Sequence, residues 1–134
     1  MVARLRAGLG CALLAGVSLG SAGSAQAFTA YVTNEKANTV SVIDTETLAV
    51  TGTWKVGRRP RGVTLSKDDK ELFVCASDDD RIDVLDTATG KVVRSLRSGP
   101  DPEQFILDQS GNPLYVANED DSQVTILDIE KNKV

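Results

Sequence analysis

The sequence repeats itself every 42 residues, without a gap. Tyr31, Phe73 and Tyr115 occupy one position of this repeat. Other equivalent sets are Val32, Val74 and Val116; Asp44, Asp86 and Asp128; and Val50, Val92 and Val134. A fixed period of this length is typical of repeat architectures, in which each copy is one supersecondary unit that stacks on its neighbours. Residues 30–134 hold 2.5 copies of 42 residues, so we expect the chain to be the N-terminal part of a longer array.

Each copy contains four short runs that alternate apolar and polar residues or are rich in strand-forming residues. In residues 61–97, which span one repeat, these runs are residues 61–65, 71–76, 81–86 and 91–97. Polar turns separate them, and no segment has a helical period. Sandwiches lack an internal period, and β-helices have much shorter repeats. We therefore predict an all-β fold, a β-propeller of four-stranded antiparallel blades, with copies that start near Ala30, Leu72 and Leu114.

Within this frame, several residues are expected to be structural. The run 81–86 alternates polar and apolar residues and predicts a half-buried strand. Asp44, Asp86 and Asp128 recur at one strand end and are predicted to accept backbone N–H groups in turns. The expected strand core is Val40, Val42, Val84, Leu85, Ile126 and Leu127.

Residues 1–27 have the features of a secretory signal. Arg4 and Arg6 provide a positive start, residues 9–17 are mostly apolar, and residues 25–27 match the A-x-A cleavage pattern. The apolar stretch is too short for a good membrane-spanning helix. We expect cleavage between Ala27 and Phe28, a periplasmic or secreted protein, and no membrane insertion after cleavage.

Composition narrows the chemistry that the chain can carry. The sequence has 15 Lys and Arg against 19 Asp and Glu, and loss of Arg4 and Arg6 would make the mature chain still more acidic. An acidic chain is a poor candidate for binding nucleic acid. The sequence has no histidine, which removes the commonest general base and transition-metal ligand. Cys75, the one cysteine after the signal, lies in an apolar run and is expected to be a small core residue rather than a reactive thiol.

Charged residues concentrate in the loops that antiparallel blade topology places on one face. Arg58, Arg59 and Arg61 precede or begin one inner strand, and Asp101 and Glu103 occupy the corresponding segment one copy later. Guanidinium groups suit carboxylates and phosphates because they present a planar fork of donors. One hypothesis is that these five residues bind a small polar or anionic ligand, or the acidic patch of a partner. The other is that the arginines pair with acidic loops on the same face.

Two acidic runs, residues 78–80 and 119–121, lie on the same face. Carboxylate oxygens bind calcium, but the first run does not fit an EF-hand loop. Counted from Asp78, position six is Asp83 rather than Gly, and position twelve is Thr89 rather than Glu. The alternative to calcium binding is that these acidic residues are solvated turn residues. No metal site is predicted.

The repeat resembles a known family. Residues 30–34 (AYVTN), followed by residues 39–44 (TVSVID), are similar to the YVTN-family β-propeller repeat, and the later copies of the first segment at 72–77 and 114–119 fit the same pattern. Residues 28–32, 74–78, 99–103 and 115–121 together resemble, more narrowly, the propeller associated with PQQ-dependent catabolism. The resemblance implies an exported seven-bladed protein of roughly 320 residues, encoded alongside transport proteins and quinoprotein alcohol dehydrogenases.

The resemblance does not extend to binding of PQQ itself. Residues 86–91 match the start of the D-x-x-T-G-K-x-x-W docking motif of quinoprotein dehydrogenases, but Arg94 stands at the tryptophan position. We predict no cofactor in these residues, and PQQ is associated only through the pathway.

These observations predict an exported binding or scaffold protein, not an enzyme, that is accessory to PQQ-dependent alcohol catabolism. The expected partner is a periplasmic quinoprotein dehydrogenase or a transporter component, and the full-length propeller is expected to be a monomer. One alternative is a propeller enzyme, quinoprotein or metal-dependent and lactonase-like, whose site lies in further blades; another is a cell-surface adhesion module. Residues 28–134 alone would expose a blade face at each end and are expected to be marginally stable or to associate.

Overall fold

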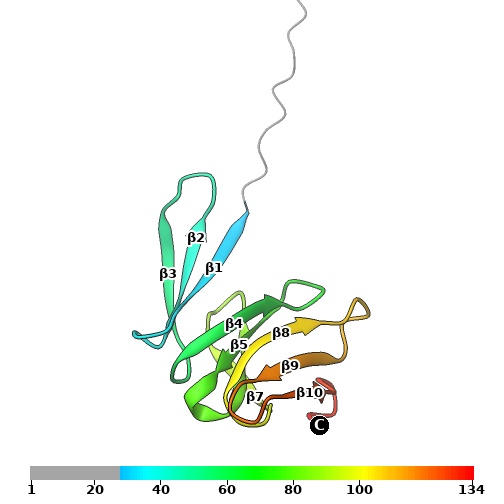
Figure 1. Cartoon of the computed structure of the whole chain (residues 1–134). Coiled ribbons are helices and arrows are strands. Elements are labelled where there is room, and N and C mark those ends of the chain that lie inside the picture. The colour runs from blue at the N-terminus through cyan, green and yellow to red at the C-terminus, as the bar shows by residue number, and fades with distance from the viewer. Residues whose placement is uncertain (1–27) are drawn as a thin grey trace, which may run out of the picture.

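The alternating runs of each repeat form antiparallel strands. The computed structural model describes residues 28–134, so the predicted signal segment 1–27 lies outside the described residues. The elements are β1 (Thr29–Asn34), β2 (Thr39–Asp44), β3 (Val50–Lys55), β4 (Pro60–Leu65), β5 (Glu71–Ala76), a 3₁₀ turn η1 (Ser77–Asp79), β6 (Arg81–Asp86), β7 (Val92–Arg97), β8 (Pro102–Leu107), β9 (Leu114–Asn118) and β10 (Gln123–Leu127) (Figure 1). No helix within residues 28–134 has the length and apolar character needed to cross a membrane.

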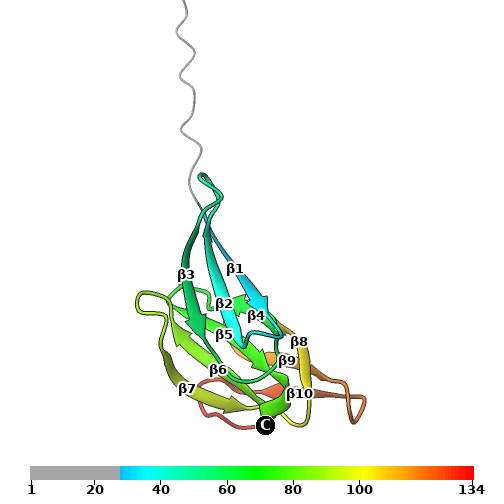
Figure 2. The ribbon, with the colours of Figure 1, turned by 90° about the vertical axis from the view of Figure 1, so that its left-hand side faces the viewer.

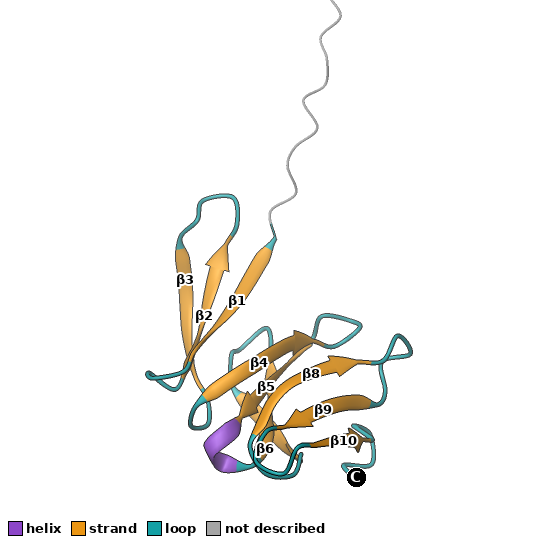
Figure 3. Ribbon diagram, viewed as in Figure 1, coloured by secondary structure: helices purple, strands orange, loops and turns teal. Residues whose placement is uncertain are grey.

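The strands form three sheets, one for each copy of the repeat (Figure 3). The middle sheet has the order β4-β5-β6-β7 and is a complete four-stranded blade. The β1-β2-β3 sheet corresponds to strands two to four of a copy, since β1 lies 42 residues before β5. The β10-β9-β8 sheet corresponds to strands one to three. The predicted all-β, partial propeller is confirmed.

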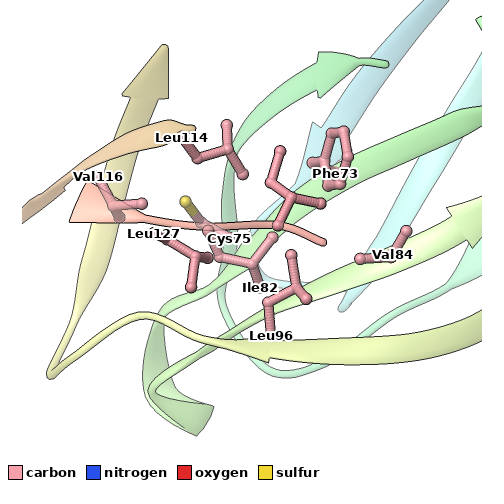
Figure 4. Packing of buried hydrophobic residues seen from close by; sticks show 9 residues of the cluster. Phe73, Cys75, Ile82, Val84, Leu96, Leu114, Val116 and Leu127 are labelled. Atoms are coloured by element: carbon pink, nitrogen blue, oxygen red, sulfur yellow. The ribbon is translucent and has the colours of Figure 1, made fainter. Parts of the chain in front are cut away.

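The middle blade buries both of its faces. Side chains alternate along a strand, so Leu72 and Val74 of β5 pack with Val40 of the first sheet. Phe73 and Cys75 of the same strand pack on the other side with residues of the third sheet (Figure 4). The members of this second cluster are Phe73, Cys75, Ile82, Val84, Leu96, Leu114, Val116, Leu127 and Ile129.

This packing corrects two details of the sequence interpretation. The run 81–86 was expected to be half-buried, but residues 82–85 of β6 are all buried because the blade has a neighbour on each side. Ile126 was expected in the core, but its side chain is 56% exposed, because no further sheet covers this side of β10 among residues 28–134. The other predicted core residues and Cys75 are buried, and burial raises the pKa of the Cys75 thiol.

The recurring aspartates have the predicted turn role. The Asp44 carboxylate accepts the Thr47 N–H at 2.8 Å, and Asp86 accepts the Thr89 N–H at 2.8 Å. Asp128 accepts the Lys131 N–H at 3.0 Å. A single turn chemistry therefore recurs in all three copies. Figures 1 and 2 show the first of these turns, between β2 and β3, projecting away from the other two sheets.

Leu114 tests the contribution of the junction between the second and third sheets, because its side chain is fully buried there. Leu114→Ala leaves a cavity, so the free energy of unfolding of the full chain should fall by about 2–5 kcal/mol. Urea titration followed by circular dichroism measures the change. The control is Leu48→Ala in the projecting turn, where Leu48 is 79% exposed. Equal losses in the two variants would contradict the assigned packing.

Candidate functional site

Four charged loops meet at one face of the stacked sheets. They are the segments before β4 and before β8, the η1 turn between β5 and β6, and the turn between β9 and β10. The Arg58 Nε atom lies 2.7 Å from an Asp79 carboxylate oxygen, which joins two loops of one blade. Arg59 contacts Asp101, which joins two adjacent blades. The structure therefore brings the five predicted residues together, on what we call the charged face.

A buried carboxylate holds the segment that carries the arginines. The Gly57 N–H donates to Asp83 at 2.7 Å, and Arg81 Nε and Ser95 Oγ donate to the other oxygen of that carboxylate at 2.7 and 3.1 Å. A Cβ atom at position 57 would lie 2.6 Å from the Ala76 Cβ, so only glycine fits there. The positioning role of Asp83 was not predicted from the sequence. The sequence signal that could have identified it is a carboxylate at a repeat position where the other copies hold Ser41 and Thr125.

Arg58 is held by the η1 turn. Its Nε donates to Asp79 at 2.7 Å, and its Nη2 donates to the Asp78 carbonyl at 2.6 Å. Burial would raise the pKa of Asp79, but the backbone and side-chain N–H groups of Arg58 outweigh it, and the pKa lies below its usual range. Arg58 therefore faces a carboxylate that stays ionised.

Arg59 and Arg61 pair across the junction between two blades. Arg59 contacts Asp101 and Arg61 contacts Glu103, and each pair joins residues that are 42 positions apart. Equivalent positions in adjacent copies thus carry opposite charges and bind each other. Arg59 also lies 3.1 Å from Glu103, and Arg61 lies 3.4 Å from Glu35. All three predicted arginines are engaged with carboxylates.

The charged face is hollowed beside these pairs. A hollow of about 290 Å³ is lined by Arg58, Arg59, Ser77, Asp78, Asp80, Asp101 and Asp120. Four carboxylates therefore face two guanidinium groups, both of which are already paired with acidic side chains. An anion would have to displace these carboxylates from the arginines, whereas a cationic group would meet an excess of negative charge.

The acidic runs do not converge on one point. Asp78 lies 3.4 Å from Arg59, Asp79 pairs with Arg58, and Asp80 accepts the Asp101 N–H at 3.0 Å. A different trio, Asp101, Glu103 and Glu119, places carboxylate oxygens within 4.8 Å of one another. Arg59 and Arg61 neutralise two of these three groups. The neighbouring Glu103 holds the pKa of Glu119 above its usual range.

The comparisons with known proteins identify the family. Residues 7–129 match the YNCE-like beta-propeller family. The chain belongs to this family. No curated protein matches the sequence.

Two solved structures show the same fold. The chain is similar to "Kuenenia stuttgartiensis Hydrazine Synthase", with a TM-score of 0.73, 22% identity, and coverage of 78% of this chain and 30% of that one. It is also similar to a functionally unknown protein from Desulfotomaculum acetoxidans DSM 771, with a TM-score of 0.59, 21% identity, and coverage of 72% and 36%. The chain thus spans about a third of the length of each of these structures.

Glu119 offers a test of the electrostatics of this face. A carboxyl whose folded pKa is raised is destabilising when ionised, and this destabilisation disappears as the pH falls through the raised pKa. Glu119→Gln should therefore raise the melting temperature of the full chain at pH 7 and leave it unchanged near pH 3. An NMR titration of the Glu119 side-chain carboxyl carbon measures the pKa directly. A pKa at or below that of a glutamate in an unfolded peptide would contradict the assigned hydrogen bond with Glu103 and the repulsion by it.

Proposed function

We propose that this YNCE-like propeller chain is an exported binding or scaffold protein that uses the charged face to hold a partner. The observation that carries this proposal is the set of ion pairs at that face. Arg59 with Asp101 and Arg61 with Glu103 break the repeat by placing opposite charges at equivalent positions. The apolar pattern and the turn aspartates recur in every copy, whereas these charged positions do not. The divergence of these positions therefore favours a role in recognition.

The charges around the hollow favour a partner of mixed or basic surface charge. Four of its lining side chains are carboxylates and two are guanidinium groups. A partner's lysine or arginine would meet Asp78 or Asp120, while its acidic groups would compete for the arginines. Complementary charge of this kind speeds encounter and fixes orientation, and it weakens as salt is added.

We propose PQQ-dependent alcohol oxidation in the periplasm as the setting. The support is the resemblance of residues 28–32, 74–78, 99–103 and 115–121 to the propeller of that pathway. The proposed partner is a periplasmic quinoprotein alcohol dehydrogenase or a component of its transporter. In this setting the protein has no catalytic step of its own and acts by bringing other proteins together.

The binding role is tested with the three arginines. The combined variant Arg58→Ala, Arg59→Ala and Arg61→Ala should weaken the Kd for a purified quinoprotein alcohol dehydrogenase from the same organism by roughly tenfold or more. Surface plasmon resonance at two salt concentrations measures both the Kd and its salt dependence. The matched control is Arg94→Ala, which removes an arginine paired with Glu71 at 2.6 Å, away from this face. Absence of binding by the parent chain, or equal binding by all variants, would reject the proposed partner.

Export is tested separately. The full reading frame expressed in its own host should give a periplasmic protein whose N-terminal residue is Phe28, because residues 25–27 fit a cleavage site. Mass spectrometry of the periplasmic fraction identifies that terminus. Replacing Ala25 and Ala27 with bulky residues should block cleavage. A cytoplasmic protein that retains residues 1–27 would contradict the proposed localisation.

A further inference from the structure

The loops that lead into β4 and β8 are held by opposite kinds of hydrogen bond. The loop before β8 lies over Asn118, whose side chain belongs to a residue that is only 3% exposed. The Asn118 amide donates to the carbonyl oxygens of Ser98 and Pro100 at 3.0 and 2.8 Å. The amide oxygen accepts from Thr125 Oγ1 at 2.8 Å. A side-chain N–H group thus holds this loop by its backbone carbonyl oxygens.

The middle blade carries different residues at both positions of this pair. Ala76 stands at the asparagine position and Asp83 at the threonine position. Asp83 is 1% exposed, and its carboxylate accepts the Gly57 N–H at 2.7 Å. A side-chain acceptor therefore holds the loop before β4 by a backbone N–H group. The two loops also differ in backbone conformation, since Gly57 and Gly99 are equivalent but only Gly99 has a positive φ, of 85°.

The difference between the loops is concentrated at the residue after the glycine. In the loop before β8 this residue is Pro100, which has no N–H group. In the loop before β4 it is Arg58, whose N–H donates to Asp79 at 2.8 Å. One residue later the loops agree again, because the Arg59 and Asp101 N–H groups each donate to a side-chain oxygen of the preceding sheet. The reversed contact therefore acts on Arg58.

Arg58 combines an exposed side chain with a fixed charged group. Its side chain is 65% exposed, yet its Nε donates to Asp79 at 2.7 Å and its Nη2 donates to the Asp78 carbonyl at 2.6 Å. Arg81 joins Asp79 to Asp83, with nitrogen–oxygen distances of 3.4 and 2.7 Å. The carboxylate that holds Arg58 is thus tied to the one that holds the loop. Within residues 28–134, Arg58 Nη1 donates to no other group.

We propose that Asp83 is a positioning residue for Arg58, which it holds ready to donate through Nη1 to an acceptor oxygen of a partner. The inference rests on the proposed binding role of the charged face. The first and third sheets form with a hydroxyl residue at this position, Ser41 and Thr125. A long side chain that is already ordered loses less entropy on binding, so positioning by Asp83 raises affinity.

Giving the middle blade the residue pair of the third sheet separates positioning from stability. Asp83→Thr alone leaves the Gly57 N–H and Arg81 without their buried acceptor, so it should lower the melting temperature of the full chain. Ala76→Asn together with Asp83→Thr introduces the hydrogen bonds of the third sheet and should recover most of that loss. The loop is then held by its carbonyl oxygens, and Arg58 should be released.

Two measurements detect this release. In the double variant, the heteronuclear NOE of the Arg58 Nε–H group should fall to that of Arg97, whose side chain makes no ion pair within residues 28–134. The Kd for the purified quinoprotein alcohol dehydrogenase should weaken roughly two- to tenfold, as in Arg58→Ala, because the side chain must then be ordered on binding. The control is Glu71→Gln, which weakens the ion pair of Arg94 and should change neither value.

The two measurements can fail separately. In the parent, Arg58 Nε–H should be as ordered as that of Arg81, and disorder equal to that of Arg97 would overturn the inference even if no variant folds. An Arg58 that stays ordered in the double variant would also overturn it. So would a double variant that binds like the parent while Arg58→Ala binds weakly. If the parent binds no dehydrogenase, the proposed partner is rejected, and the NMR comparison still decides whether Asp83 positions Arg58.

Discussion

The burial of both faces of the middle blade is the constraint on which the rest of the structure depends. Alternate residues of β5 point in opposite directions, so Leu72 and Val74 pack on one neighbour while Phe73 and Cys75 pack on the other. A shift of one residue in strand register would exchange the two sets. The strict 42-residue spacing preserves this register from copy to copy. The same register places the loops of adjacent blades side by side and so creates the charged face.

A hydrogen bond at each junction fixes the position of the loops. Asn38 Oδ1 accepts the Arg59 N–H at 2.9 Å, and Asp80 Oδ1 accepts the Asp101 N–H at 3.0 Å. These are equivalent contacts one copy apart. Arg59 and Asp101 both have positive φ, 51° and 42°, which turns the chain sharply before each inner strand. The orientation of the charged side chains therefore follows from the backbone of the junction.

The sequence was sufficient to predict the parts of this structure that repeat. The four strands of the middle blade lie within one residue of their predicted bounds, and the turn role of Asp86 was expected from its recurrence. The burial of Asp83 and the exposure of Ile126 were not expected. Both depend on which neighbours a sheet has, and local alternation carries no information about neighbours. The sequence also left two interpretations of Arg59 open, because periodicity gives the face of a residue but not the reach of a long side chain.

The ion pairs tie the charged face, where we propose that a partner binds, to the packing of the blades. Arg59 contacts Asp101 of the next blade, and the Asp101 N–H is held by Asp80. A partner that displaces Arg59 from Asp101 therefore acts on a junction that also contains the apolar cluster of Phe73 and Leu114. A partner that instead uses Asp120, which forms no ion pair among the described residues, leaves this junction intact. Because the second route breaks no existing ion pair, it has the smaller desolvation and pairing cost. For the proposed partner, a basic group that meets a carboxylate of the hollow therefore disturbs the blade junction less than an acidic group that displaces Arg59.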